Sequence, residues 1–133
     1  MKNDDAKVNS WIERLRALPE MGERAAPDAA EAVHRVIDLQ IHRATDPDGV
    51  PWPPRKEDGQ KALQTAGKAV TVVPVGSRIY CRVTGHIGRH NLGRAKGGTI
   101  RRILPVSGIP RSYSAAIKRV LDEYWAREMK GRS

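Results

Sequence analysis

Apolar residues recur at helical spacing along the first third of the chain. Residues 4–18 carry an apolar residue every three or four positions, which predicts an amphipathic helix with the stripe Val8, Trp11, Ile12, Leu15 and Leu18. Residues 19–26 contain a proline and a glycine and predict a connector. Pro27 suits a first helical position and Asp28 complements the helix dipole, so we expect a second helix over residues 27–44. Its apolar side consists of Val33, Val36, Ile37, Ile41 and Ala44.

A proline-rich loop follows this helix. Four prolines and a glycine within residues 45–54 exclude regular structure there. The run Asp46-Pro47-Asp48-Gly49 supplies turn-forming residues. Trp52 lies between prolines, and we expect it to anchor the loop against the domain. Residues 55–60 are polar and predict a mobile stretch.

Two β-prone runs then predict a hairpin. Residues 69–75 and 78–84 flank Gly76-Ser77, which fits a two-residue type II′ turn. The register that this turn imposes opposes Val75 to Arg78, Pro74 to Ile79, Val73 to Tyr80, Val72 to Cys81, Thr71 to Arg82 and Val70 to Val83. One face is then apolar and the other mixed and basic, as a sheet with one solvated side requires. Because Pro74 lacks an amide donor, its strand is expected at an edge.

The rest of the chain completes the expected fold. Residues 85–98 are rich in glycine and basic residues and predict a long flexible loop, and residues 99–106 are compatible with a further strand. A last helix is expected from Ser114, as its N-cap, to Met129, with the stripe Ile117, Val120, Leu121, Tyr124 and Trp125. We therefore expect an α+β fold in which N-terminal helices and a C-terminal helix pack on a small antiparallel sheet built around the hairpin.

Length and composition fit one such domain. The chain has 133 residues, of which 39% are apolar, enough for a single domain with a modest core. Within it we expect an N-terminal helix and connector in residues 1–25 and the core in residues 26–130. The charged N-terminus is unlike a signal peptide, and no apolar run approaches about 18 residues, so no membrane partner is expected. A lone cysteine, Cys81, is typical of a reducing compartment and indicates synthesis in a cytoplasm.

The net charge of +9 is concentrated in one block. Residues 59–121 contain neither Asp nor Glu and carry twelve basic side chains, so the remaining residues have a net charge of −3. Such a block predicts an anionic partner, which is either nucleic acid or an acidic protein surface. The basic residues of this block that we expect to face that partner are Arg89, Arg94, Lys96, Arg101 and Arg102. The residues leave open whether this basic loop binds phosphate backbones or orders on an acidic protein.

Catalytic and metal-binding patterns find little support. The acid-free block offers no carboxylate to orient a histidine or to hold a metal. Cys81, His86 and His90 are ligand types, but a zinc site takes four ligands and no other lies nearby. The glycines of residues 85–98 fit neither the dinucleotide fingerprint nor the Walker pattern. We expect no enzyme activity, no cofactor and no metal.

Two motifs resemble the virion-morphogenesis, or tail-completion, family of Mu-like phages. The first is Asp46-Pro47-Asp48-Gly49-Val50-Pro51-Trp52-Pro53-Pro54, which is similar to the family pattern Asp-Pro-x-Gly-x-x-Trp-x-Pro. The second is Ile109-Pro110-Arg111 before the last helix. Between them lie a segment similar to the family's Thr-Gly region at Leu63–Lys68, a hairpin and a histidine–glycine region. The chain departs from the family at Ala66, which interrupts the Thr-Gly pair, and at Ser112-Tyr113-Ser114, where Pro-Phe is more common.

The resemblance implies a structural protein of the virion at the head–tail junction, present in the host cytoplasm during assembly. It implies a homo-oligomeric ring, expected as a hexamer, that contacts neck, connector or tail-tube proteins, and it leaves open a contact with packaged DNA. Within the motifs, Trp52, Pro110 and Arg111 are the expected structural anchors. The alternative from the charge block alone is a sequence-nonspecific nucleic-acid-binding protein. Against it, the block lacks the interleaved aromatic residues on which single strands stack.

Overall fold

The computed structural model describes residues 18–55, 57–92, 100–105 and 108–131. In chain order they form the elements α2 (Leu18–Arg43), the 3-10 helix η1 (Ala66–Ala69), β1 (Val70–Val75), β2 (Arg78–Val83), α3 (Gly85–Leu92) and α4 (Arg111–Gly131). The two strands pair antiparallel, so the expected α+β class is confirmed. The helix expected over residues 4–18 lies outside the described residues except for Leu18.

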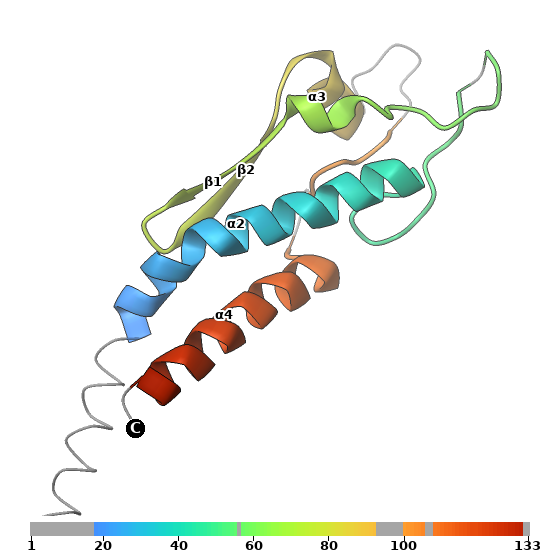
Figure 1. The fold of residues 1–133 in the computed structure, drawn as a ribbon. Helices are drawn as coiled ribbons and strands as arrows, with labels where there is room; N and C mark the ends of the chain where they lie inside the picture. The colour runs from blue at the N-terminus through green and yellow to red at the C-terminus, as the bar shows by residue number, and fades with distance from the viewer. Residues whose placement is uncertain (1–17, 56, 93–99, 106–107, 132–133) are drawn as a thin grey trace, which may run out of the picture.

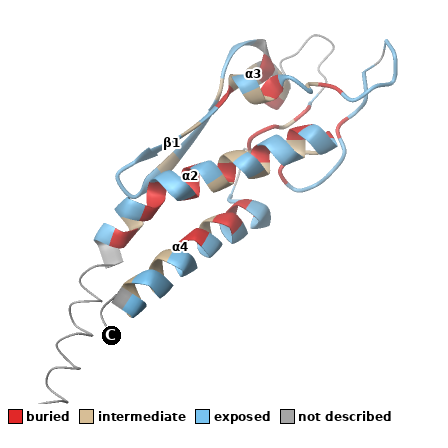
Figure 2. Cartoon of the chain, in the orientation of Figure 1, coloured by how far each residue is buried: buried red, intermediate tan, exposed pale blue. Residues whose placement is uncertain are grey.

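Helix α2 is the central element of the fold. The hairpin runs along one side of it and α4 along another (Figure 1). α4 is antiparallel to α2, because Glu128 near its end pairs with Arg24 and Ser112 near its start bonds to Gln40. In Figure 2 buried residues recur at helical intervals along both helices. On α2 these include a row spaced by four, Met21, Ala25, Ala29, Val33, Ile37 and Ile41.

The start of α2 corrects one prediction. Residues 19–26 are helical and Pro27 lies inside the helix, so the expected connector is wrong. The reason is that the apolar row begins before the proline, where Met21 and Ala25 are buried. Packing of this row offsets the hydrogen bond that Pro27 cannot donate. A Cβ on Gly22 would lie 3.6 Å from Ser77 Cβ, so the hairpin turn rests against this first part of α2.

The end of α2 falls one residue before the predicted position. Thr45 N donates to Gln40 O and Ala44 N donates to Ile41 O, both at 3.0 Å. These two bonds, with Ala44 at φ +55, form the C-terminal capping arrangement in which one left-handed residue ends a helix. The chain leaves α2 here in the direction of the proline-rich loop.

The hairpin register is confirmed at every position. All six predicted pairs, from Val70 with Val83 to Val75 with Arg78, are present. Gly76 has φ +62, as the first central position of a type II′ turn requires. The apolar face turns inward, with Val70 buried, whereas Tyr80 is 50% exposed on the outer face. Each strand has one outer edge that no other described strand covers, so the edge position expected for the strand of Pro74 is confirmed.

Two predictions that follow the hairpin are wrong. Residues 85–92, expected as part of a flexible loop, form α3, and residues 93–98 of that loop lie outside the described residues. Residues 100–105 form no strand, because their backbone groups bond elsewhere. Arg101 N donates to His90 O at 3.1 Å, and the Asn91 side chain accepts from Ile103 N and Leu104 N, each at 2.7 Å. The end of α3 therefore takes the place of a neighbouring strand.

Helix α4 begins three residues earlier than expected. It starts at Arg111 rather than at Ser114, so Ser114 lies inside the helix and is not its N-cap. The carbonyl of Pro110 accepts from Tyr113 N and Ser114 N at 3.1 Å each and closes the first turn instead. Of the predicted stripe, Val120 is buried and its other members are half-buried. α4 thus meets α2 through a row that includes Ile117, Val120, Leu121 and Tyr124.

Candidate interaction site

The proline-rich loop is closed by its own aspartate. Asp46 Oδ1 accepts from Asp48 N at 2.9 Å and from Val50 N at 2.8 Å. The backbone adds a bond from Asp46 N to Val50 O at 2.8 Å, and Gly49 takes φ +87, which only glycine adopts without strain. Turn chemistry predicted from these residue types is therefore present, and it fixes the shape of the loop.

Trp52 anchors this loop, as predicted. Its side chain is 6% exposed and belongs to the main hydrophobic core. The indole Nε1–H donates to Arg102 O at 2.9 Å, and Trp52 N donates to Ala44 O at 2.8 Å. A buried indole with its donor satisfied holds two segments together that lie 50 residues apart.

Arg101 does not face an anionic partner. It is 8% exposed, and its Nε and Nη2 donate to the carbonyls of Pro53 and Pro54 at 2.9 and 3.1 Å. Arg102 is half-buried and donates from Nη1 to Asn91 O at 2.9 Å. The guanidinium of Arg101 thus secures the proline-rich loop, because a buried arginine needs acceptors for its donors and the two carbonyls supply them. The prediction that Arg101 lies at a partner surface is wrong.

The other predicted basic residues are not gathered by the described structure. Arg89 lies on α3, but its side chain is not among the described ones, and Arg94 and Lys96 lie outside the described residues. Asn91, which the sequence did not single out, has a clear structural role in this region. It is 6% exposed and binds residues 103–104 to the end of α3. Its position two residues before a glycine–arginine pair offered no signal of this role.

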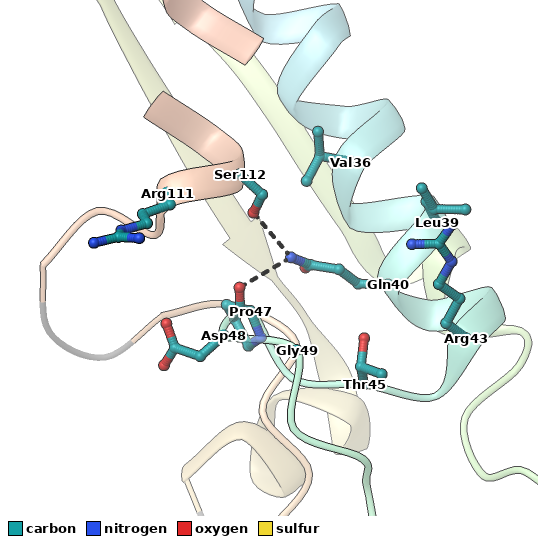
Figure 3. A pocket seen from close by; sticks show the side chains of 10 residues that line it. All are labelled: Val36, Leu39, Gln40, Arg43, Thr45, Pro47, Asp48, Gly49, Arg111 and Ser112. Carbon is teal, nitrogen blue, oxygen red and sulfur yellow. Dashed lines mark hydrogen bonds between the residues drawn. The ribbon is translucent and has the colours of Figure 1, made fainter. Parts of the chain in front are cut away.

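The proline-rich loop and the start of α4 enclose an open surface hollow of about 550 Å³. Figure 3 shows Gln40 reaching from α2 between them. Its Nε2 donates to Pro47 O at 3.3 Å and lies 3.4 Å from Ser112 Oγ. We call this site the hollow, and the residues that line it are Val36, Leu39, Gln40, Arg43, Thr45, Pro47, Asp48, Gly49, Arg111 and Ser112.

The hollow is amphipathic. Leu39 is 46% exposed at its edge, and Arg43, Asp48 and Arg111 are exposed around it. Pro110, an expected anchor, is buried beside the hollow, and its carbonyl closes the first turn of α4. Arg111, the third expected anchor, instead exposes its side chain. An apolar shelf with charges at its rim suits contact with another protein surface.

A second, apolar groove of about 260 Å³ lies between β2 and α4. Cys81 and Tyr113 both line it. Burial raises the pKa of the Cys81 thiol. Burial, and secondarily the charge of a Cys81 thiolate, raises the pKa of Tyr113 far above its ordinary value. Both groups are therefore neutral at physiological pH, which makes neither of them a ready nucleophile or base.

Neither a metal site nor a membrane-spanning helix is found among the described residues. Within the described parts of the chain, no three His, Cys, Asp or Glu side chains gather closely enough to hold a metal ion. Of the candidate ligands, Cys81 lies on β2 and His90 on α3, while the side chain of His86 is not described. No helix among the described residues has the length and apolar character needed to cross a membrane. Comparison with known proteins gave no match among family models, curated proteins or solved structures.

Proposed function

We propose that this chain is a structural subunit of a tailed-phage particle that joins head to tail. It acts at the neck, as a tail-completion or tail-terminator protein, and assembles as a hexameric ring in the virion. The observation that supports the proposal is the meeting of two motifs far apart in the sequence. Residues 47–49 and Arg111, which belong to the motifs that carry the resemblance to the tail-completion family, line the same hollow.

The contacts of Gln40 explain why this meeting favours a binding role. If the motif residues only stabilised the fold, we would expect them to be buried. Here the side chain of Gln40 ties Pro47 to Ser112, while Asp48 and Arg111 next to them remain exposed. The two motifs thus build a shaped, partly charged surface rather than only a core. In a ring such a surface repeats around the axis, so weak contacts add up.

Complementation of a phage in which the gene is disrupted tests the role. We expect the lysate to hold full heads separate from tails, or tails of abnormal length, when viewed by electron microscopy. Wild-type protein supplied in the host restores joined particles, whereas Arg111→Glu does not. Glutamate at the first turn of α4 is favourable for the helix dipole, so this variant keeps its fold.

Arg119→Glu is the matched control. Arg119 is exposed on the same helix and lies outside the hollow. It carries the same charge reversal and is expected to restore joined particles. Normal particles in the disrupted phage would refute the neck role. Equal failure of Arg111→Glu and Arg119→Glu would refute the assignment of the hollow.

Sequence-nonspecific binding of nucleic acid is the second candidate, and the acid-free block of residues 59–121 favours it. It predicts that affinity for duplex DNA falls steeply as salt rises, because each neutralised phosphate releases counterions. Charge reversal of Arg89, Arg94 and Lys96 would then reduce both the affinity and the salt dependence. In the neck role the same triple reversal leaves DNA affinity low and unchanged and instead blocks joining.

A further inference from the structure

The hydrogen-bonding phase of the hairpin determines which backbone groups point outward. Thr84 N donates to Ala69 O at 3.1 Å, so this pair is a hydrogen-bonded one. Hydrogen-bonded and non-hydrogen-bonded pairs alternate along an antiparallel ladder. Counting along the register, Cys81 opposite Val72 and Ile79 opposite Pro74 are non-hydrogen-bonded pairs. Their amide and carbonyl groups therefore point away from the partner strand.

The outer edge of β1 is closed to further pairing. Pro74 stands at one of its outward positions and has no N–H to donate. The side of α2 also lies along this edge, where Pro27, Glu31 and His34 share a shallow depression with Val72. Proline at an outward position is a common way to prevent strand addition at an exposed edge.

The outer edge of β2 carries no such block. Ile79 and Cys81 direct two amides and two carbonyls outward, and no described residue bonds to them. The unpaired edge of β2 ends at Val83, because α3 covers the strand there. A Cβ on Gly88 of α3 would lie only 3.3 Å from Val83 O. The two edges of this hairpin thus differ, with one closed by sequence and the other open over about four residues.

The apolar groove described above runs beside the open edge. Ile79, Cys81 and Tyr113 line it together with the segment that precedes α4. Its volume of about 260 Å³ is several times the roughly 30 Å³ that one water occupies in the liquid. Ile109 on its far wall is 72% exposed. A strand added to β2 would place every second side chain into this groove, where they would cover exposed apolar surface.

The outer face of β2 indicates the chemistry of such a strand. Arg78, Tyr80 and Arg82 alternate with the groove-facing residues and are exposed. Directly opposite and diagonal positions across a strand pair interact, and opposite charges stabilise them. A second copy of β2 would bring arginines beside arginines, and residues 59–121 contain no acid to compensate. Charge complementarity therefore favours a different chain.

We propose that the open edge of β2 and the adjacent apolar groove bind, by strand addition, an extended segment of another protein in which apolar and acidic side chains alternate. The apolar side chains fill the groove, the acidic ones meet Arg78 and Arg82, and the backbone bonds to Ile79 and Cys81. This inference does not rest on the proposed phage role, since it follows from the hairpin and the groove beside it.

A fluorescent nine-residue peptide of alternating valine and glutamate, blocked at both ends, is the probe. Its binding to the full chain is followed by fluorescence anisotropy. We expect saturable binding that Cys81→Pro weakens at least about tenfold, because proline removes an outward donor and blocks the approach of a strand. Cys81→Val, which keeps the donor, and Val72→Pro, which alters the edge that is already closed, are matched controls expected to change affinity less than about twofold.

Far-UV circular dichroism shows whether Cys81→Pro folds. If it does not, two further experiments still test the proposal. The same peptide with N-methyl groups on alternate residues should lose binding to the unaltered protein. In the double variant Arg78→Glu with Arg82→Glu, preference should switch to a peptide with lysine in place of glutamate. Both results support strand addition on the basic face.

Several outcomes would overturn the proposal. Binding of the N-methylated peptide at full strength would exclude backbone pairing, and unchanged preference in the double arginine variant would exclude the acidic partner. Absence of peptide binding together with self-association that Cys81→Pro abolishes would identify a second copy as the occupant. Binding of duplex DNA in competition with the peptide would assign the face to nucleic acid. The peptide results do not bear on whether the protein joins head to tail.

Discussion

The bond pair made by Asn91 gives the sharpest test of the fold. Its Oδ1 accepts from Ile103 N and Leu104 N at 2.7 Å each, and Asn91 is 6% exposed. The two donors belong to residues that are 1% and 8% exposed, so water does not reach them readily. Asn91→Ala leaves both amides without an acceptor.

The expected loss in free energy of unfolding follows from the number of backbone donors left without an acceptor. A buried donor left without a partner costs about 1–3 kcal/mol. Two of them, with some relaxation of the segment, should lower the free energy of unfolding by about 2–4 kcal/mol. That is a large share of the roughly 5–15 kcal/mol by which a domain is stable. Asn91→Asp is the control, because a carboxylate still accepts from both amides, and a loss under about 1 kcal/mol is expected.

Urea unfolding followed by tryptophan fluorescence and circular dichroism measures both variants. The slope of the transition should stay constant, so that the midpoint alone reports the change. A loss below about 0.5 kcal/mol in Asn91→Ala would refute the reasoning, since ordinary surface substitutions have that effect. So would an Asn91→Asp variant as unstable as Asn91→Ala, because the acceptor would then be irrelevant.

Three further changes test other parts of the structure by urea unfolding. Trp52→Phe removes the indole donor to Arg102 O and should cost about 1–2 kcal/mol, and an unchanged midpoint would show that the bond contributes nothing. Pro27→Ala should stabilise α2 by about 1–3 kcal/mol, since position 27 is exposed and alanine restores a helical donor; destabilisation would contradict this. Burial raises the pKa of Tyr113, so the folded protein keeps this residue neutral above pH 10, where an unfolded tyrosine ionises. The contribution of Tyr113 to the free energy of unfolding is therefore fully present below pH 10. It falls as pH rises further, by up to about 1.4 kcal/mol per pH unit. Tyr113→Phe should therefore lose less stability than the wild type between pH 9 and pH 11, and equal losses would exclude this residue as the cause.

The parts of the fold that the sequence predicted correctly are determined by neighbours along the chain. The hairpin register follows from alternation and from Gly76-Ser77, both of which are local. The anchoring of Trp52 was expected because a large aromatic between prolines has few other uses. By contrast, α3 was missed because Gly85 and Gly88 are typical of loops. Its position depends on packing of Ile87 in the core and on Asn91, which bonds to residues 12 and 13 positions later.

The candidate site was harder to predict, because its geometry depends on contacts across the chain. A run of arginines indicates an anionic partner only when the side chains reach the surface. Arg101 does not, since the carbonyls that it binds lie 47 and 48 residues away. The hollow likewise requires the loop after α2 and the start of α4 to meet. The motifs were visible in the sequence, but their convergence was not.

The start of α4 separates the two candidate surfaces. Arg111 and Ser112 line the hollow, whereas Pro110 and Tyr113 line the groove beside β2. A change to the backbone at the helix start would disturb both, so each surface is probed through a side chain that lines it alone, Arg111 for the hollow and Cys81 for the groove. If the surfaces bind different partners independently, the effects of Arg111→Glu and Cys81→Pro on peptide affinity should add as free energies, with no coupling beyond about 0.5 kcal/mol. A larger coupling would mean that α4 transmits occupancy of one surface to the other.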